Sequence, residues 1–384
     1  MAKEIHAVLL CTSPLQVINA KAAVDKNQKS DGIERKLTVV MIHPLLSITS
    51  KRCVKRISSQ LQCEVIDLSL AHEKMLREGR SSKEYGDAKS SALTHRAKRL
   101  LDRYTRWQQK IGSEIEVHVG EIQEAYCRSR VSALETFFLG ALEPEVKKFG
   151  IEDGLGDYVP SSWPISHLNF YEIRHKVRRL VTTGSVFFAG GVLTHNWSKW
   201  KEISSLSTPK WSDEFSVLER SGYRSTSKEV LRNLRRLENH DVEAPRIGVL
   251  ILGTLFSPRF KFNITEEVQF YNQRIKAITR DHNIGREEIY YKHHPRLSRE
   301  QWQYKNEHLD CNVVPFESET IAEEELLRPD VSAVYSVGST SLLYARPLFG
   351  VPSFCWDLSM CRDVHPSAFK KYRYLALRHQ IPVR

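Results

Sequence analysis

Short apolar runs alternate with segments of helical periodicity over the first half of the chain. The run Ala7 to Leu10 predicts a strand, and the turn behind it predicts a helix that Ser13 caps and whose first turn contains Pro14. The same pattern predicts further strands at Lys36 to Ile42, Cys63 to Leu68, Glu116 to Val119 and Lys148 to Ile151. Strands separated by helices usually pair in parallel, so this half is expected to be Rossmann-like.

Two longer segments of the first half are polar. Between Lys74 and Lys110 the apolar residues fall on one stripe, which predicts a long helix, and a further helix is expected across Ser132 to Ala141. The stretch Ser204 to Ala244 is rich in Ser, Arg and Glu and has little strand character. We expect it to contain helical packing and the interdomain linker.

A second series of strands and helices begins at the buried run Ile247 to Leu252. Helices are expected at 266–281, at 321–327 and from Ser339, and strands at 289–292, 311–314, 331–337 and 353–356. The predicted fold class is therefore α/β with two Rossmann-like domains. We expect these domains at residues 1–240 and 241–360, followed by a C-terminal helical segment, residues 361–384, that packs back towards the N-terminal domain.

Composition adds limits on location and partners. The apolar runs are far shorter than a membrane span and no signal-peptide core is present, so a cytoplasmic location is expected. Seven cysteines without a CxxC pair are expected to be reduced thiols, and no structural metal site is expected. The net charge of +11 favours anionic partners, which leaves nucleic acid, anionic lipid and polyanionic glycans open beside a merely solvated basic surface.

Ligands of open α/β sheets bind beyond the carboxyl ends of the strands, and polar clusters follow several predicted strands here. The first cluster is Glu152-Asp153-Gly154, directly after Lys148 to Ile151. A carboxylate at this place could act as a general base on an acceptor hydroxyl. An ordinary surface turn is the alternative interpretation.

The second cluster is His293-His294-Pro295-Arg296. Because Pro295 ends the strand and fixes the loop, an imidazole could be held at the strand end to stabilise a departing phosphate. A loop with a surface histidine is the alternative. The adjacent histidines are expected to point apart.

The third cluster consists of Ser336 followed by Gly338-Ser339-Thr340. Hydroxyl groups and backbone amides at a helix start can bind a phosphate, and Gly338 would permit close approach. Simple capping of the helix by Ser339 is the alternative.

The fourth candidate is Glu317, which follows Pro315 and could accept hydrogen bonds from ribose hydroxyls. Neighbouring acidic residues are expected to lie at a helix start or to face solvent: Glu319, Glu323, Glu324 and Glu325. The chain has no GxxxxGK[ST] loop, no GxSxG elbow and no DxD sequence, which disfavours P-loop ATPases, α/β-hydrolases and metal-bridged nucleotide-sugar sites.

In this order, the clusters resemble the motifs of bacterial sialyltransferases: an acidic-acidic-Gly motif, a His-Pro motif and a Ser/Thr pair. Their spacing is most similar to the capsular alpha-2,8-polysialyltransferases (glycosyltransferase family 38), and the segment "TSPLQVINA" is similar to lipooligosaccharide sialyltransferases. The resemblance implies a GT-B glycosyltransferase whose two Rossmann-like domains face a central cleft, with the acceptor on the N-terminal domain and the nucleotide donor on the C-terminal one. It also implies CMP-sialic acid as donor, inversion at the anomeric carbon and no metal or other cofactor.

The resemblance also implies roles for individual residues. Glu152 would be the base and Asp153 would support it, while His294 of the His294-Pro295 motif would stabilise the departing CMP phosphate. Ser339 and Thr340 would hold that phosphate, with Ser336, Gly338 and Pro295 beside them, and Glu317 would bind the ribose. Basic candidates for the acceptor site are Arg96, Arg99 and Arg103.

The implied partners are the nucleotide-sugar donor and an anionic glycan or glycolipid acceptor. Peripheral contact with the inner face of the membrane stays open as an alternative to a purely cytoplasmic location. Two other functions stay open as well. One is another capsular or teichoic polymer transferase, such as a transferase of a different acidic sugar or a teichoic-acid-type polymerase with a CDP-glycerol donor, whose pattern of a His-Pro motif and helix-start serines this chain also resembles. The other is a basic nucleic-acid-binding protein, although the chain lacks the usual nucleic-acid-binding patterns.

Overall fold

The computed structural model describes residues 4–41, 48–68, 115, 117, 119–128, 135, 138–139, 142–143, 145–152, 211–237, 248–254, 263–295, 297–357 and 373–384. Within these residues the chain forms two compact units, of which the first holds one parallel sheet and the second, including Val217–Arg384, holds the other. The predicted α/β class with two Rossmann-like sheets is confirmed. The long helix predicted between Lys74 and Lys110 lies outside the described residues.

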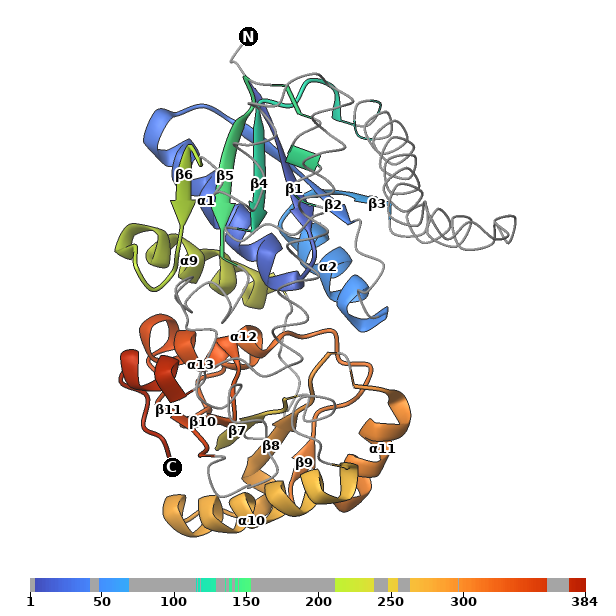
Figure 1. The fold of residues 1–384 in the computed structure, drawn as a ribbon, viewed down its shortest axis with the longest axis vertical. Coiled ribbons are helices and arrows are strands. Elements are labelled where there is room, and N and C mark those ends of the chain that lie inside the picture. Colours follow the sequence, from blue (N-terminus) through green and yellow to red (C-terminus); the bar gives the residue numbers. More distant parts are fainter. Residues whose placement is uncertain are drawn as a thin grey trace, which may run out of the picture. The chain divides into compact units, whose positions relative to one another are not determined.

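The first sheet has six strands in the order β3-β2-β1-β4-β5-β6, and every pair is parallel (Figure 1). Its elements are β1 (Ile5–Cys11), α1 (Pro14–Asp31), β2 (Arg35–Met41), α2 (Ile48–Gln60), β3 (Glu64–Asp67), β4 (Glu124–Arg128), β5 (Lys147–Ile151) and β6 (Asp213–Phe215). Because apolar side chains cover both faces of β1, the strand is buried along almost its whole length, as a central parallel strand should be.

The strand predicted at Glu116 to Val119 in the first unit is wrong. Ile115, Val117 and Val119 lie in a helix instead of a strand. Their spacing of two residues suggested a half-buried strand, but Ile115 and Val119 are also one helical turn apart, and both are buried while Val117 is 81% exposed. Two strands of this sheet were not predicted. They are β4, which lies between β1 and β5, and the short strand β6, which falls in the stretch Ser204 to Ala244 that was expected to have little strand character.

The second sheet has five parallel strands in the order β11-β10-β7-β8-β9 (Figure 1). Its strands are β7 (Val249–Leu252), β8 (Ile289–Lys292), β9 (Asn312–Val313), β10 (Ala333–Ser336) and β11 (Ser353–Cys355). The helices of the unit are α9 (Ser221–Leu237), α10 (Ile264–His282), η2 (Arg286–Glu288), α11 (Arg299–His308), α12 (Ala322–Glu325), α13 (Thr340–Tyr344) and the π-helical turn η3 (Ala345–Phe349). Apart from η2, η3 and α11, each of these helices overlaps a segment that was predicted to be helical.

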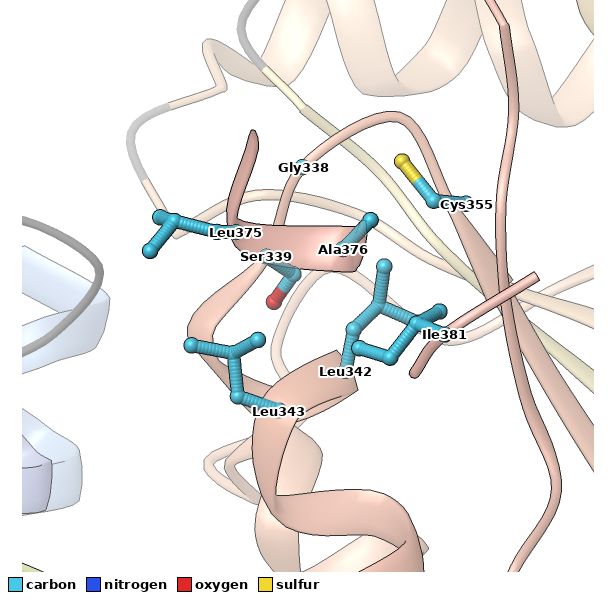
Figure 2. A pocket seen from close by; sticks show the side chains of 8 residues that line it. All are labelled: Gly338, Ser339, Leu342, Leu343, Cys355, Leu375, Ala376 and Ile381. Atoms are coloured by element: carbon cyan, nitrogen blue, oxygen red, sulfur yellow. The ribbon is translucent and has the colours of Figure 1, made fainter. Parts of the chain in front are cut away.

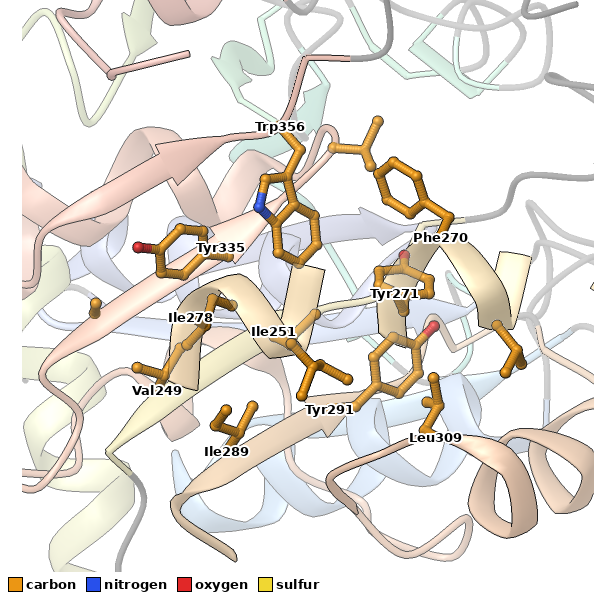
Figure 3. Packing of buried hydrophobic residues seen from close by; sticks show 14 residues of the cluster. Val249, Ile251, Phe270, Tyr271, Ile278, Ile289, Tyr291, Leu309, Tyr335 and Trp356 are labelled. Atoms are coloured by element: carbon orange, nitrogen blue, oxygen red, sulfur yellow. The ribbon is translucent and has the colours of Figure 1, made fainter. Parts of the chain in front are cut away.

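The core of the second unit is unusually aromatic. Tyr271 of α10 packs edge-to-face on Tyr291 of β8 and on Trp356, and Tyr335 of β10 stacks on Trp356 (Figure 3). Aromatic pairs in these geometries add to the free energy gained from burial alone. The core therefore fixes α10 firmly against β7, β8 and β10.

The last described residues complete the edge of the second sheet. Val383 forms an isolated parallel bridge with Cys355, and the N–H of Cys355 donates to Pro382 O over 2.9 Å. Arg384 lies over the ring of Phe354 and donates to Tyr335 Oη over 3.2 Å. Residues 373–384 thus pack on the second unit.

Two simple properties of the described residues complete the fold. None of the six described cysteines forms a disulfide. Among the helices that the structure describes, none combines the length and the apolar content needed to cross a lipid bilayer.

Candidate active site

Each sheet contains one point at which the strand order reverses. In the first sheet it lies between β1 and β4, and in the second between β7 and β10. Helices that follow the two central strands leave in opposite directions at such a point, which opens a crevice at the carboxyl ends of these strands. The sequence-predicted clusters can be placed relative to these two points.

Glu152 directly follows β5 and is only 2% exposed. Its N–H donates to Phe215 O of β6 over 3.3 Å, and its carbonyl oxygen accepts a hydrogen bond of 3.1 Å from Asn19 Nδ2 of α1. The carboxylate therefore lies at the carboxyl edge of the first sheet, where a general base is expected. Asp153 and Gly154, the other residues of the motif, lie outside the described residues.

The turn between β1 and α1 lies at the reversal point of the first sheet and was not among the predicted site residues. Gln16 Oε1 accepts hydrogen bonds from the N–H of Thr12 (2.6 Å) and the N–H of Ser13 (3.2 Å), so the first turn of α1 is tied to the end of β1. The spacing Ser13-x-x-Gln16, which is that of a capping box, is the signal that could have found this turn.

The two adjacent histidines after β8 have different environments. His293 is 4% exposed and stacks on Phe316, with ring centroids 5.6 Å apart. Burial, reinforced by the positive charges of Lys292 and Lys305, lowers the pKa of His293 to about 4, so its imidazole is neutral at neutral pH. His294 is half-buried and Pro295 is exposed, which leaves His294 as the more accessible imidazole of the motif.

Lys292, the last residue of β8, is a buried cation that was not among the predicted site residues. Its Nζ donates to Thr320 Oγ1 over 2.9 Å and to Ser318 Oγ over 3.4 Å. Thr320 Oγ1 in turn donates to Glu325 Oε1 over 2.6 Å. Lysines are common in the sequence, so only the folded structure, in which this one is buried at a strand end, distinguishes Lys292 as a candidate site residue.

The Ser and Gly residues after β10 meet the end of β7 at the reversal point of the second sheet. Ser336 is completely buried, and its Oγ donates to Leu252 O over 2.8 Å and accepts from Gly338 N over 3.3 Å. Thr254, which the prediction did not include, has its Oγ1 3.4 Å from Ser336 Oγ. The pair Gly253-Thr254 directly follows a buried strand, and this position in the sequence is the signal that could have identified Thr254.

Ser339 and Thr340 begin α13. Ser339 is the N-cap residue, and its Oγ accepts from Ser341 N over 3.3 Å, so the capping interpretation is confirmed. Figure 2 shows Gly338 and Ser339 beside a small, mostly apolar pocket that α13, Cys355 and the C-terminal residues Leu375, Ala376 and Ile381 also line. Both Ser339 and Thr340 are half-buried and so partly accessible.

Glu317 lies after the edge strand β9. Its side chain is 57% exposed and forms an ion pair with Arg299 Nη2 over 3.0 Å. In the strand order of this sheet, β7 and β8 separate β9 from β10. The structure thus brings Ser336, Gly338, Ser339 and Thr254 together, places His293 and His294 two strands away from β10, and leaves Glu317 at the sheet edge.

The three glutamates of α12 lie at a helix start, as predicted, but the alternative that they face solvent is wrong. Each of the three is buried and accepts a hydrogen bond: Glu323 from Ser341 Oγ (2.7 Å), Glu324 from Ile321 N (2.7 Å) and Glu325 from Thr320 Oγ1 (2.6 Å). Burial raises the pKa of Glu323. The carboxylates of α12, a helix of one turn, are therefore buried hydrogen-bond acceptors.

Two further expectations concern the acceptor site and metal ions. The basic acceptor candidates Arg96, Arg99 and Arg103 lie outside the described residues. Within the described part of the chain, no three His, Cys, Asp or Glu side chains are grouped so that they could hold a metal ion.

Comparison with known proteins identifies one family. The family model described as alpha-2,8-polysialyltransferase (POLYST) matches residues 7–357. The similar solved structures include the GT-B domain of a sialyltransferase from Photobacterium damselae, with 10% identity, a TM-score of 0.48 and coverage of 100% of this chain and 98% of that chain. They also include an alpha/beta-galactoside alpha-2,3-sialyltransferase from the luminous marine bacterium Photobacterium phosphoreum, with 11% identity, a TM-score of 0.40 and coverage of 99% and 97%.

A third similar structure is the E. coli heptosyltransferase WaaC with ADP-2-deoxy-2-fluoro heptose, with 9% identity, a TM-score of 0.42 and coverage of 92% of this chain and 88% of that chain. Comparison with the curated proteins finds no match.

Proposed function

Because the chain belongs to the alpha-2,8-polysialyltransferase family, we propose that it transfers sialic acid from CMP-sialic acid to a hydroxyl group of a glycan acceptor. Family membership makes the chain a glycosyltransferase, and its two Rossmann-like units are the components of a GT-B fold. The proposal is more specific than the family in its donor, in its mechanism and in the residues that carry them out.

The placement of Glu152 is the observation that carries the proposal. Its carboxylate is buried at the carboxyl edge of a parallel sheet, and the main chain on both sides of its Cα is hydrogen-bonded. In the proposed reaction Glu152 accepts the proton of the acceptor hydroxyl while the hydroxyl oxygen attacks the anomeric carbon. The bond from that carbon to the phosphate oxygen breaks on the opposite face, its electron pair leaves with CMP, and the configuration inverts. Asp153 would support the base.

Residues of the second unit would bind the donor and stabilise the departing CMP. The accessible imidazole of His294, next to Pro295, would donate to the phosphate oxygen that gains charge. Ser339 and Thr340 would hold the phosphate, Gly338 would allow its close approach, and Glu317 would bind the ribose hydroxyls. Ser336, which is buried behind them, would hold their turn in place.

The proposal includes no metal ion, because hydrogen-bond donors in a site that excludes water can stabilise the phosphate by themselves. The acceptor would be an anionic glycan or glycolipid, which the net charge of +11 supports. Arg96, Arg99 and Arg103 would contact it. The proposed location is the cytoplasm, with peripheral contact at the inner face of the membrane.

Release of CMP from CMP-sialic acid tests the proposal. It is measured in EDTA buffer with and without sialylated or galactose-terminated acceptors, and stimulation by one of these acceptors is expected. Glu152→Ala is expected to lose transfer and keep CMP binding, whereas His294→Ala slows donor turnover. His308→Ala, which changes an exposed histidine of α11, is the matched control and should keep the wild-type rate.

Two results contradict the proposal. Near-wild-type transfer by both Glu152→Ala and His294→Ala would show that the site is misplaced. No release from CMP-sialic acid and no CMP binding, combined with turnover of a CDP-glycerol donor, would favour the teichoic-acid-type transferase.

A further inference from the structure

We infer that Asn19 is the positioning residue of the proposed base, because it holds the main chain of Glu152 in the orientation that transfer requires. The inference rests on the proposed function of Glu152 and assigns a part to α1, which lies outside the acidic-acidic-Gly, His-Pro and Ser/Thr motifs. Asn19 does not touch the substrate in this proposal and acts only through Glu152.

The contact itself joins two distant parts of the chain. Asn19 Nδ2 donates to Glu152 O over 3.1 Å, across 133 residues of sequence, and the two residues are 1% and 2% exposed. The carbonyl of Glu152 belongs to the peptide group that follows its Cα, while the N–H that donates to Phe215 O belongs to the preceding one. Both peptide planes around this Cα are therefore fixed, and so is the direction of its Cα–Cβ bond.

The position of Asn19 is itself fixed by the link between α1 and the end of β1. It lies one helical turn after Gln16, whose Oε1 accepts from the N–H groups of Thr12 and Ser13 and so ties α1 to the end of β1. From β1 the parallel ladder continues through β4 to β5. Asn19 thus closes a ring of contacts from β1 through α1 and Glu152 back to the sheet.

The position of this contact explains its importance. Glu152 is the first residue after β5, so it lies outside the strand that the parallel ladder aligns. Without Asn19, a buried carbonyl would lose a hydrogen-bond donor, and the chain could relieve this cost by moving. A displacement of about 1 Å is enough to lower the rate of a well-aligned reaction by roughly a hundredfold.

The test compares transfer with hydrolysis in the full-length chain. Asn19→Leu removes the amide at similar volume, and Asn19→Ala serves if the leucine variant does not fold. Either variant is expected to lower transfer to the acceptor by roughly tenfold to a hundredfold. Donor KM and the Kd for CMP should stay unchanged. Hydrolysis of CMP-sialic acid without acceptor should fall less, because a water molecule can follow a displaced carboxylate whereas a bound sugar hydroxyl cannot.

Asn27→Leu is the matched control. Asn27 lies on the same helix, and its Nδ2 also bonds the first sheet, at Tyr126 Oη over 3.1 Å, but it is two turns further from Glu152. This variant should keep the wild-type ratio of transfer to hydrolysis.

The possible outcomes separate this inference from the proposed function. If Glu152→Ala abolishes transfer while Asn19→Leu and Asn19→Ala keep the wild-type ratio, the inference is wrong and the assignment of the base stands. If transfer and hydrolysis fall equally and CMP binding weakens, Asn19 has only a structural role, which also overturns the inference. If Glu152→Ala keeps the wild-type rate, both the base and its positioning residue are wrong.

Discussion

Thr254 Oγ1 lies 3.4 Å from Ser336 Oγ, so the ends of β7 and β10 meet through two hydroxyl groups at the reversal point of the second sheet. Ser336 completes this junction by bonding Leu252 O of β7 and the N–H of Gly338. The turn that leads into Ser339 is therefore held by β7 as well as by its own strand. Any ligand group bound at Ser339 depends on this junction.

Replacing Ser336 by alanine should weaken CMP binding. The variant removes the hydroxyl that holds Gly338, so the Kd for CMP is expected to rise roughly fivefold, measured by calorimetry. Ser332→Ala is the control, because Ser332 Oγ makes the equivalent bond to Gly248 O at the opposite end of the same two strands. An equal change in both variants would mean that only the pairing of β7 and β10 matters.

Replacing Gly253 by alanine should destabilise the second unit. A Cβ at this position would lie 2.3 Å from Tyr291 Oη, and Tyr291 cannot easily move because Lys305 Nζ donates to it over 2.9 Å in the buried core. We expect a loss of about 1 to 3 kcal/mol in the free energy of unfolding, measured by denaturant titration. Gly222→Ala has no atom within 4 Å of the new Cβ and should be neutral or slightly stabilising.

The buried His293 should make stability depend on pH. Its pKa of about 4 in the folded state is below the ordinary value of 6.5, so between these pH values only the unfolded chain binds the proton. The free energy of unfolding is therefore unaffected by this proton above pH 6.5. It decreases as the pH falls towards 4, by up to about 3 kcal/mol. His293→Phe, which keeps the aromatic contact with Phe316, should reduce the dependence of the thermal unfolding midpoint on pH in this range. Unchanged curvature would contradict the assignment to His293.

The sequence predicted most helices and strands because their apolar periodicity matches burial in a doubly wound sheet. It failed at β4, where the buried strand begins with Glu124, a residue whose charge is compensated by Arg35 from 89 positions away. It also missed the burial of the glutamates of α12. Glu323 accepts from Ser341 Oγ, 18 positions away, whereas the donors to the other two glutamates lie three and five positions before them. The partners of Glu124 and Glu323 are thus distant in the sequence.

The candidate site was predictable only in part for the same reason. Glu152, His294 and Ser339 follow strands, and this order is visible in the chain. Which of the two histidines is buried depends on Phe316, and the roles of Thr254 and Asn19 depend on contacts across the sheet or between a helix and a strand. None of these contacts has a pattern in the linear sequence.

Losing one member of the ion pair between Arg35 and Glu124 should destabilise the fold more than replacing both members together. Both side chains are buried, at 2% and 1% exposure, with Arg35 Nη2 3.1 Å from Glu124 Oε1. Glu124→Leu leaves a buried guanidinium with less compensation and should cost about 3 to 5 kcal/mol in denaturant titration, whereas Arg35→Met combined with Glu124→Leu should recover most of this loss. Lys36→Met is the control, because it breaks the exposed Lys36 to Glu64 pair on the adjacent strands, and should change stability by less than about 1 kcal/mol. If the double variant is as unstable as Glu124→Leu alone, the charge compensation argued here for β4 is wrong.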